Sequence, residues 1–175
     1  MSTNVPRPGP PAQATSPEQT AEVVGWFSDG WRVGATDQRR FFEHFGACLT
    51  PDAVLIQPLS PVLRGPRGLR ELFEPLFRIM PDLRGEVVRW SASQDGLFIQ
   101  LALHGTLGGR NVEWTTVDHI LLRGNLIAAR RSYFDPLPLV VALLSRPAAV
   151  VKLLLLMMLG RTQTRTPSYA DAQEQ

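Results

Sequence analysis

Cysteine is almost missing from this 175-residue chain, in which Cys48 is the single copy. An internal disulfide is therefore impossible, and a zinc site built from several cysteines is excluded. Strong charge is missing as well, because the formal net charge is only +2 and the arginines are scattered along the sequence. A nucleic-acid surface needs clustered cations, so we expect no nucleic-acid partner.

The composition that remains is that of a globular protein with one domain. Hydrophobic residues make up 44% of the chain and charged residues 19%, which supplies enough apolar material for one core. No apolar stretch follows a basic start, so we expect no signal peptide and a cytoplasmic location. Residues 1–17 hold five prolines and predict a disordered tail, and the polar residues 161–175 predict a flexible one.

The most apolar part of the chain is the segment 137–160, which approaches the length of a membrane-spanning helix. Arg146, Pro147 and Lys152 interrupt it, and each central charge would cost about 2.5–3.5 kcal/mol in a bilayer. Pro147 also favours two short helices over one long helix. We therefore expect apolar C-terminal helices that pack on the domain or on a partner. Contact with a membrane surface, or a tail anchor, is the alternative.

The first half of the chain has the spacing of helices. Ser16-Pro17-Glu18-Gln19 contains the residues of a helix start, and apolar side chains then recur at helical intervals. A second helix follows, and a third is expected over residues 67–80, where Pro75 should kink it or mark its start. Between the second and third helices, residues 53–57 predict a short strand.

Beyond the third helix the apolar period changes to two, which indicates strands. Four of them are expected, at residues 84–93, 96–107, 110–123 and 125–135. The breaks between them are rich in glycine, asparagine and aspartate, as in hairpin turns. The order of elements predicts an α+β fold in which helices lie on one face of a curved, mostly antiparallel sheet.

Three short sequences connect this chain to a known superfamily. They are Pro51-Asp52-Ala53-Val54 at the first strand, Val117-Asp118-His119 on the strand before the last, and Arg131-Ser132-Tyr133-Phe134-Asp135 on the last strand. In this order, residues 18–136 resemble the SnoaL-like and ketosteroid-isomerase-like proteins, also called nuclear-transport-factor-2-like. The resemblance implies a cone-shaped α+β barrel with three helices that close a deep apolar pocket. It also implies a homodimer formed through the sheet, and no cofactor.

Strand alternation indicates which side chains of residues 96–107 face the interior. Leu101 and Leu103 belong to an apolar row and are expected in the core or pocket. His104 has the opposite parity, so it should point outward, to solvent or to a partner subunit. A catalytic His104 is the alternative.

On the last two strands the resemblance assigns the inner face, because alternation alone does not decide it. Asp118 matches the oxyanion-hole aspartate of the ketosteroid isomerases, which points inward. On that matching, the other inward side chains are Trp114, Thr116, Arg130, Ser132 and Phe134.

Two well-known mechanisms of the superfamily do not fit these residues. Ketosteroid isomerisation needs a carboxylate base where this chain has Gln57, and a tyrosine from the first helix, which contains none here. Hydrolases similar to limonene-epoxide hydrolase have a water-activating aspartate where this chain has Ser132. We therefore exclude both, and Asp118 remains as the residue matched to an inward acid.

We expect Asp118 and Arg130 to pair inside the fold, since a lone buried charge is costly and an opposite charge keeps a carboxylate ionised. Asp118, held by Arg130, would then be the acid/base group or the anchor for an apolar ligand; a purely structural ion pair is the alternative. No metal site is expected, because the histidines lack ligand spacing. Gln57, Thr116 and Ser132 would orient the ligand, and Trp31, Leu101, Leu103, Trp114 and Phe134 would form its apolar wall.

Two functions follow from this hypothesis. The first is a cofactor-independent enzyme that performs cyclisation, isomerisation or hydration on an apolar small molecule by proton transfer. The second is a binding or accessory protein that uses the same fold without catalysis and docks through its C-terminal helices.

Overall fold

The structure of the protein, a computed structural model, describes residues 17–34 and 36–144. The tails expected at residues 1–17 and 161–175 lie outside these ranges, except for Pro17, which begins the first helix. Most of the apolar segment 137–160 also lies outside them. The described residues therefore cover the predicted domain and the start of the C-terminal segment.

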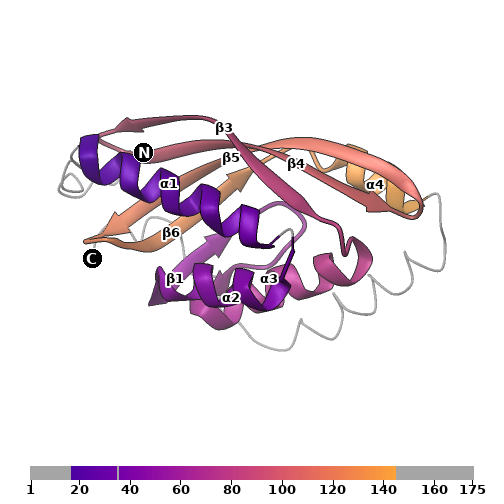
Figure 1. The fold of residues 1–175 in the computed structure, drawn as a ribbon, viewed down its shortest axis with the longest axis horizontal. Coiled ribbons are helices and arrows are strands. Elements are labelled where there is room, and N and C mark those ends of the chain that lie inside the picture. The colour runs from indigo at the N-terminus through magenta and orange to yellow at the C-terminus, as the bar shows by residue number, and fades with distance from the viewer. Residues whose placement is uncertain (1–16, 35, 145–175) are drawn as a thin grey trace, which may run out of the picture.

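Three helices precede the long strands (Figure 1). They are α1 (Pro17–Gly34), α2 (Gln38–Ala47) and α3 (Gly65–Ile79). α1 packs along the edge strand β3 (Arg84–Ser93), and α2 lies between α1 and α3. α3 continues through Pro75, so Pro75 does not mark the start of this helix. Pro66 occupies the first turn instead, where the missing N–H of proline leaves no helical bond unmade.

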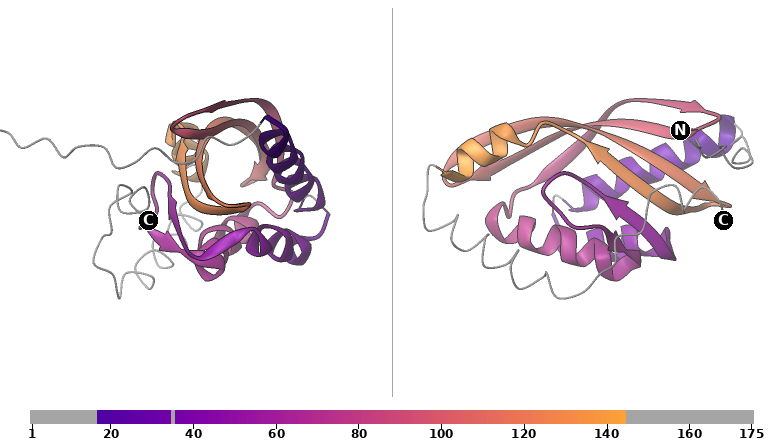
Figure 2. Two further views of the ribbon diagram at one scale, coloured as in Figure 1. Left: turned by 90° about the vertical axis from the view of Figure 1, so that its left-hand side faces the viewer. Right: turned by 180° about the vertical axis from the view of Figure 1, so that it is seen from behind.

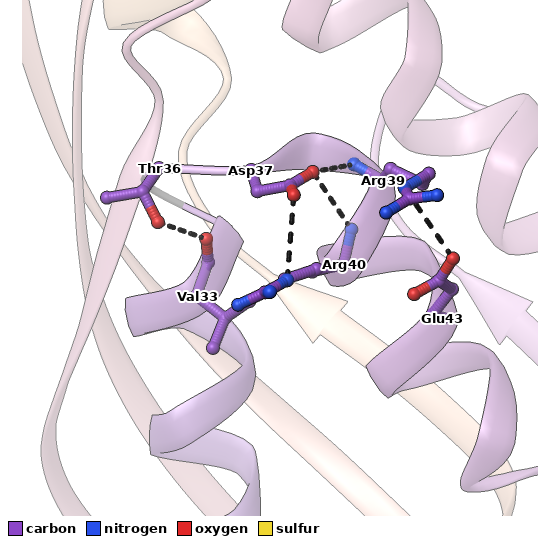
Figure 3. A network of polar contacts seen from close by, with 6 residues as sticks. All are labelled: Val33, Thr36, Asp37, Arg39, Arg40 and Glu43. Atoms are coloured by element: carbon purple, nitrogen blue, oxygen red, sulfur yellow. Dashed lines mark hydrogen bonds and ion pairs between the residues drawn. The ribbon is translucent and has the colours of Figure 1, made fainter.

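The junction between α1 and α2 shows how short polar side chains set the helix ends (Figure 3). Asp37 caps α2, because its Oδ1 atom accepts hydrogen bonds from the backbone N–H groups of Arg39 at 2.9 Å and Arg40 at 3.2 Å. The Thr36 hydroxyl donates to the Val33 carbonyl oxygen, 3.0 Å away, at the end of α1. This tight junction lets α1 and α2 pack against each other.

Six strands form one sheet in the order β2-β1-β6-β5-β4-β3. The remaining bounds are β1 (Leu49–Ile56), β2 (Leu63–Arg64), β4 (Gly96–Leu107), β5 (Arg110–Arg123) and β6 (Leu126–Tyr133). Neighbouring strands are antiparallel except β1 and β6, which run parallel. The long strands form a strongly curved sheet, and α1 lies beside it in the end-on view (Figure 2). The predicted α+β fold with a curved sheet is confirmed, and the sheet stays open between its edge strands β2 and β3.

The core lies between the helices and the inner face of the sheet. β4 alternates between buried and half-buried residues along its length, and its buried set includes Leu101 and Leu103. The predicted apolar row is therefore confirmed, and it identifies the inner face. The buried aromatic side chains contributed by the three helices are Phe27, Trp31, Phe41, Phe42, Phe45, Phe73 and Phe77.

A short helix, α4 (Leu137–Leu144), follows β6 and lies against β5 near one end of the sheet (Figure 1). Leu139 and Ala142 pack on the core, whereas Leu137 and Val141 are exposed. The described part of the apolar C-terminal segment is thus a helix on the domain. Within the described ranges, no helix is long and apolar enough to cross a membrane.

Candidate functional site

A buried ion pair lies on the inner face of the sheet, where β5 and β6 meet. Arg130 Nε donates to Asp118 Oδ2 at 2.7 Å, and Arg130 Nη2 donates to Asp118 Oδ1 at 3.1 Å. Two such bonds fix both the position and the plane of the carboxylate. The Asp118 side chain is 0% exposed and that of Arg130 is 9% exposed, so water screens this pair very little. The pairing that the sequence predicted is present in the structure.

The strand register explains why these two side chains meet. Asp118 pairs with Ser132 across β5 and β6, and Ile120 pairs with Arg130, so Arg130 is the diagonal neighbour of Asp118. A long side chain reaches its diagonal neighbour on the same face of a sheet. Ser132 lies directly opposite and donates from its hydroxyl to Asp118 Oδ1 at 2.5 Å. Thr116, next on the same face of β5, has its hydroxyl 3.5 Å from that oxygen.

The two carboxylate oxygens of Asp118 accept different numbers of hydrogen bonds. Oδ1 accepts from Ser132 and Arg130, with the Thr116 hydroxyl at the limit of hydrogen-bond distance. Among the described residues, Oδ2 accepts only the bond from Arg130 Nε. A carboxylate oxygen has two lone-pair positions, so one position on Oδ2 has no hydrogen-bond donor among the described residues.

The Arg130 guanidinium also contacts an aromatic ring of α3. Its Cζ atom lies 5.7 Å from the centroid of the Phe73 ring, within cation–π range. Trp31 of α1 packs edge to face on the same ring, with centroids 5.8 Å apart. Arg130 Nη1 and Trp31 Nε1 are both buried, and neither has a hydrogen-bond partner in the part of the chain that the structure describes.

Phe73 belongs to this group of side chains, although no local sequence pattern indicated it. The helical spacing of α3 predicted which of its faces is apolar, but it contains no information about which side chains that face meets. Only the packing of α3 against β1, the neighbour of β6 in the sheet, brings the ring to Arg130. A basic residue in a strand gives no signal that a distant phenylalanine lies beneath it.

The predicted apolar wall lies next to the ion pair on the inner face. Leu101 pairs with Thr116 across β4 and β5, and Leu103 pairs with Trp114. All four side chains are buried. Trp31 approaches this row from α1, because a Cβ atom built on Gly85 would meet both the Trp31 ring and the Leu103 side chain within 2.9 Å.

Gln57 and Phe134 lie at the margin of the predicted site, and both are half-buried. Phe134 packs against the core. Gln57 follows β1, where Ile56 pairs with Arg131 of β6. Its side chain forms no hydrogen bond with other described residues. The structure therefore places Gln57 outside the hydrogen-bonded group around Asp118.

The three histidines lie away from this group. His104 is on the outer face of β4 with Nδ1 3.6 Å from Glu113, as expected from its parity. His44 stacks on the Trp26 ring, and its Nε2 atom lies 2.8 Å from the Trp26 carbonyl oxygen. His119 stacks on an outer-face phenylalanine of β4. Among the residues described, no three His, Cys, Asp or Glu side chains are grouped to hold a metal ion.

A hollow of about 450 Å³ lies at the end of the β4–β5 hairpin, away from the ion pair. It is lined by Asp82, Arg84, His104, Gly105, Thr106, Asn111, Val112 and Glu113. His104, the alternative catalytic residue, lines it, whereas none of the residues predicted around Asp118 does. A hydrogen bond from the Thr106 backbone N–H holds the pKa of Asp82 below its ordinary value of 3.8. The Asp82 carboxylate thus stabilises the β4–β5 hairpin and does not contact the buried Asp118–Arg130 pair.

Comparison with known proteins gives one match in sequence. The sequence profile of the SnoaL-like domain matches residues 31–130, which is more than half of the chain. No curated protein matches the chain.

Comparison of the fold gives several solved structures. A candidate SnoaL-like polyketide cyclase from Jannaschia sp. CCS1 is 23% identical, with a TM-score of 0.64 over 77% of this chain and 99% of that chain. AclR of Streptomyces galilaeus, a candidate hydroxylase, is 18% identical, with a TM-score of 0.60 over 73% of this chain and 99% of that one. IdmH of Streptomyces antibioticus, a candidate polyketide cyclase, is 17% identical, with a TM-score of 0.59 over 71% and 98%. At these identities the similarity is one of fold.

Proposed function

Because the chain belongs to the SnoaL-like domain family, we propose that it binds an apolar small molecule against the inner face of its sheet and transfers a proton through Asp118. Arg130 and Ser132 hold the carboxylate in place. The chemistry is cyclisation, isomerisation or hydration, and it uses no cofactor. Leu101, Leu103, Trp114, Trp31 and Phe134 supply the apolar wall, and Thr116 and Gln57 supply polar contacts.

The observation that carries this proposal is the unequal occupation of the Asp118 oxygens. Oδ1 is committed to Ser132 and Arg130, whereas Oδ2 keeps one acceptor position. A base must accept the proton from within hydrogen-bond distance, and a carboxylate with a fixed plane offers one direction for that approach. Oδ2 is therefore the atom that we assign to proton transfer.

Arg130 has a second effect during such a transfer. When Asp118 takes a proton it becomes neutral, and the negative charge moves to the ligand. The guanidinium stays positive because it does not lose its proton in proteins. In a buried site it therefore stabilises the ligand anion as it forms, without any rearrangement of the protein. The same ion pair thus positions the base and balances the charge of the product.

The test uses 2-tetralone, an apolar ketone with acidic protons on the carbon between its ring and its carbonyl. The protein should accelerate exchange of these protons for deuterium, followed by NMR in D₂O. Asp118→Asn keeps the shape of the side chain but removes the base, so the acceleration should fall by about 10²–10⁴-fold. Asp52→Asn, at an exposed aspartate on β1, is the matched control and should retain it. Unchanged exchange in Asp118→Asn would contradict the acid/base role.

A non-catalytic binding or accessory protein is the second candidate, and a specific observation favours it. Asp118 is fully buried with its charge matched by Arg130, which is also the arrangement of a structural ion pair. Such a protein would dock through α4, where Leu137 and Val141 are exposed. In this case 2-tetralone should raise the melting temperature of the wild type, and the protein should not accelerate the exchange of its protons.

The proposed assembly is a cytoplasmic homodimer that forms through the outer face of the sheet. Tyr133 is exposed on that face, and the Arg131 guanidinium lies 5.4 Å from its ring. Sedimentation velocity of the full chain tests the assembly. A Tyr133→Glu variant should sediment as a monomer, and a wild-type monomer would contradict the proposal. Contact with a membrane surface through residues 137–160 is the alternative mode of attachment, and flotation with vesicles would reveal it.

A further inference from the structure

The hollow at the end of the β4–β5 hairpin lies apart from the buried ion pair, and its walls are fixed by the fold. Its volume of about 450 Å³ is within the range of binding sites for small molecules. Asp82 forms one wall, because its Oδ1 atom accepts a hydrogen bond from the Thr106 backbone N–H at 2.9 Å. The buried residues Gly105 and Val112 also line the hollow. Three segments of the chain therefore bound it: the residues at the start of β3, the end of β4 and the start of β5.

Three of the side chains that line the hollow form one row across the sheet. Arg84 of β3 pairs with His104 of β4, and His104 pairs with Glu113 of β5. Directly opposite residues on neighbouring strands have their side chains on the same face of the sheet. Arg84 and Glu113 are two strand spacings apart, which separates their backbones by about 9–10 Å, and His104 lies between them. The row therefore presents a positive and a negative charge on the two sides of one histidine.

Neither charged end of this row is hydrogen-bonded in the described part of the chain. Arg84 is exposed, and its guanidinium forms no hydrogen bond or ion pair with a described residue. Asp82 attracts Arg84 only at a distance, since its carboxylate bonds to Thr106 instead. Glu113 has a side chain that is 71% exposed, and its Oε2 atom lies 3.6 Å from His104 Nδ1, which is longer than a hydrogen bond. The five N–H groups of one side chain and the carboxylate of the other are thus left for a ligand.

The chemistry of such a ligand follows from the two charges. A purely anionic ligand would match Arg84 but would be repelled by the carboxylates of Glu113 and Asp82. A purely cationic ligand would match these carboxylates but would be repelled by Arg84. A molecule with a carboxylate at one end and an ammonium group at the other matches both ends of the row. A carboxylate also suits the planar guanidinium, which can donate two parallel hydrogen bonds to it.

We propose that the hollow is a second ligand site, in which Arg84 binds the carboxylate and Glu113 the ammonium group of a small zwitterion, such as an ω-amino acid or a dipeptide. His104 lies beneath the part of the ligand that joins the two charges. The site is independent of the proposed function, which uses the inner face of the sheet. Tyr133 of the proposed dimer face pairs with Val117, four residues from Glu113 along β5, so the hollow lies toward the end of that face. Each exposed ion pair contributes little, so we expect dissociation constants of about 1 mM.

The experiment compares three probes of one length on the full chain: 5-aminopentanoate, pentanoate and pentylamine. An NMR titration follows the backbone amide signals of Gly105 and Thr106, which line the hollow, and gives a dissociation constant for each probe. The zwitterion should bind about two- to fivefold more tightly than either singly charged probe, because it forms one additional exposed ion pair. Salt at 1 M should remove most of this difference, because it shortens the screening length to about 3 Å.

Two substitutions separate the roles of the charged ends. Arg84→Gln should lower the affinity for 5-aminopentanoate to that for pentylamine, and Glu113→Gln should lower it to that for pentanoate. Arg89→Gln, at an exposed arginine on the same face of β3, is the matched control and should change neither affinity. Equal affinities for the three probes, or an equal loss in Arg89→Gln, would overturn the assignment of the two charges. Amide signals that do not move with any probe would overturn the site and show that the hollow holds only water.

Discussion

Two of the aspartate–arginine pairs in the described part of the protein join different strands, and they lie in opposite surroundings. Asp118 and Arg130 are buried on the inner face of the sheet, where two guanidinium nitrogens donate to the carboxylate. Asp52 of β1 and Arg123 of β5 meet at the surface, with side chains 48% and 42% exposed. There a single nitrogen, Arg123 Nη1, lies 3.2 Å from both carboxylate oxygens.

The difference shows that the position of an ion pair, and not its residue types, decides how much the pair contributes to the stability of the fold. Water offers the exposed pair alternative partners for both charges, so breaking it changes little. The buried pair has no such alternative, and loss of one partner leaves the other charge uncompensated in a medium of low dielectric constant. Predictions that compare the two pairs therefore test the role of burial directly.

The largest expected effect comes from breaking the buried pair. Arg130→Met keeps much of the side-chain volume but leaves Asp118 without its counter-charge, which should lower the free energy of unfolding by about 3–5 kcal/mol. Arg123→Met, the matched change in the exposed pair, should leave the denaturation midpoint almost unchanged. Urea unfolding followed by circular dichroism measures both variants. Similar losses in both would show that burial does not distinguish the pairs.

A smaller effect is expected when a neutral partner of the buried carboxylate is removed. Ser132→Ala deletes the hydroxyl that donates to Asp118 Oδ1, and a hydrogen bond to a charged group contributes about 1.5–3 kcal/mol. Ser93→Ala removes an exposed hydroxyl of β3 and should have almost no effect. The same urea titration measures the two losses. If Ser132→Ala matched Ser93→Ala, the carboxylate would not depend on its serine.

Salt should separate the two pairs further. Raising the ionic strength from 0.1 M to 1 M shortens the screening length from about 10 Å to about 3 Å, which weakens interactions between exposed charges. The coupling energy of Asp52 and Arg123 in a double-mutant cycle should therefore fall, while that of Asp118 and Arg130 should persist. A salt-sensitive coupling in the inner pair would mean that water reaches it.

The smallest effect concerns pH and the exposed pair. The Thr50 hydroxyl and the Arg123 guanidinium hold the pKa of Asp52 below its ordinary value of 3.8. The unfolded chain therefore binds this proton more readily than the native protein. Asp52 therefore stabilises the folded protein at pH values above its ordinary pKa. This contribution is lost as the pH falls through the lower pKa that Asp52 has in the folded protein. Asp52→Asn should make unfolding slightly less dependent on pH below 3.8, as measured by thermal melts. An unchanged acid slope would contradict this contribution.

Local patterns were enough to predict much of the fold. The change of period after α3, together with the turn sequences, placed β3, β4 and β5 correctly, because strand alternation and hairpin geometry depend on neighbouring residues. The parity of β4 also separated Leu101 from His104. The inward position of Asp118 was predicted through the resemblance, since alternation along β5 was ambiguous.

Contacts between distant elements were harder to predict. The pairing of β1 with β6 is parallel and joins the two ends of the domain, and no local pattern reports it. The start of α3 was placed too late, because Pro66 suits the first turn of a helix as well as it suits a loop. The contact of Arg130 with Phe73 depends on how α3 packs under the sheet.

The sequence alone specified which residue types alternate along each strand and where the turns fall. It also specified that an aspartate and an arginine lie on adjacent strands. Tertiary structure decided which Asp–Arg pair is buried, which oxygen of Asp118 keeps an acceptor position, and that Trp31 and Arg130 share one aromatic ring. The physical reason is one of range. Alternation and turn formation act over a few residues, whereas burial and hydrogen bonding require side chains from α1, α3, β5 and β6 to be placed within a few ångströms of one another.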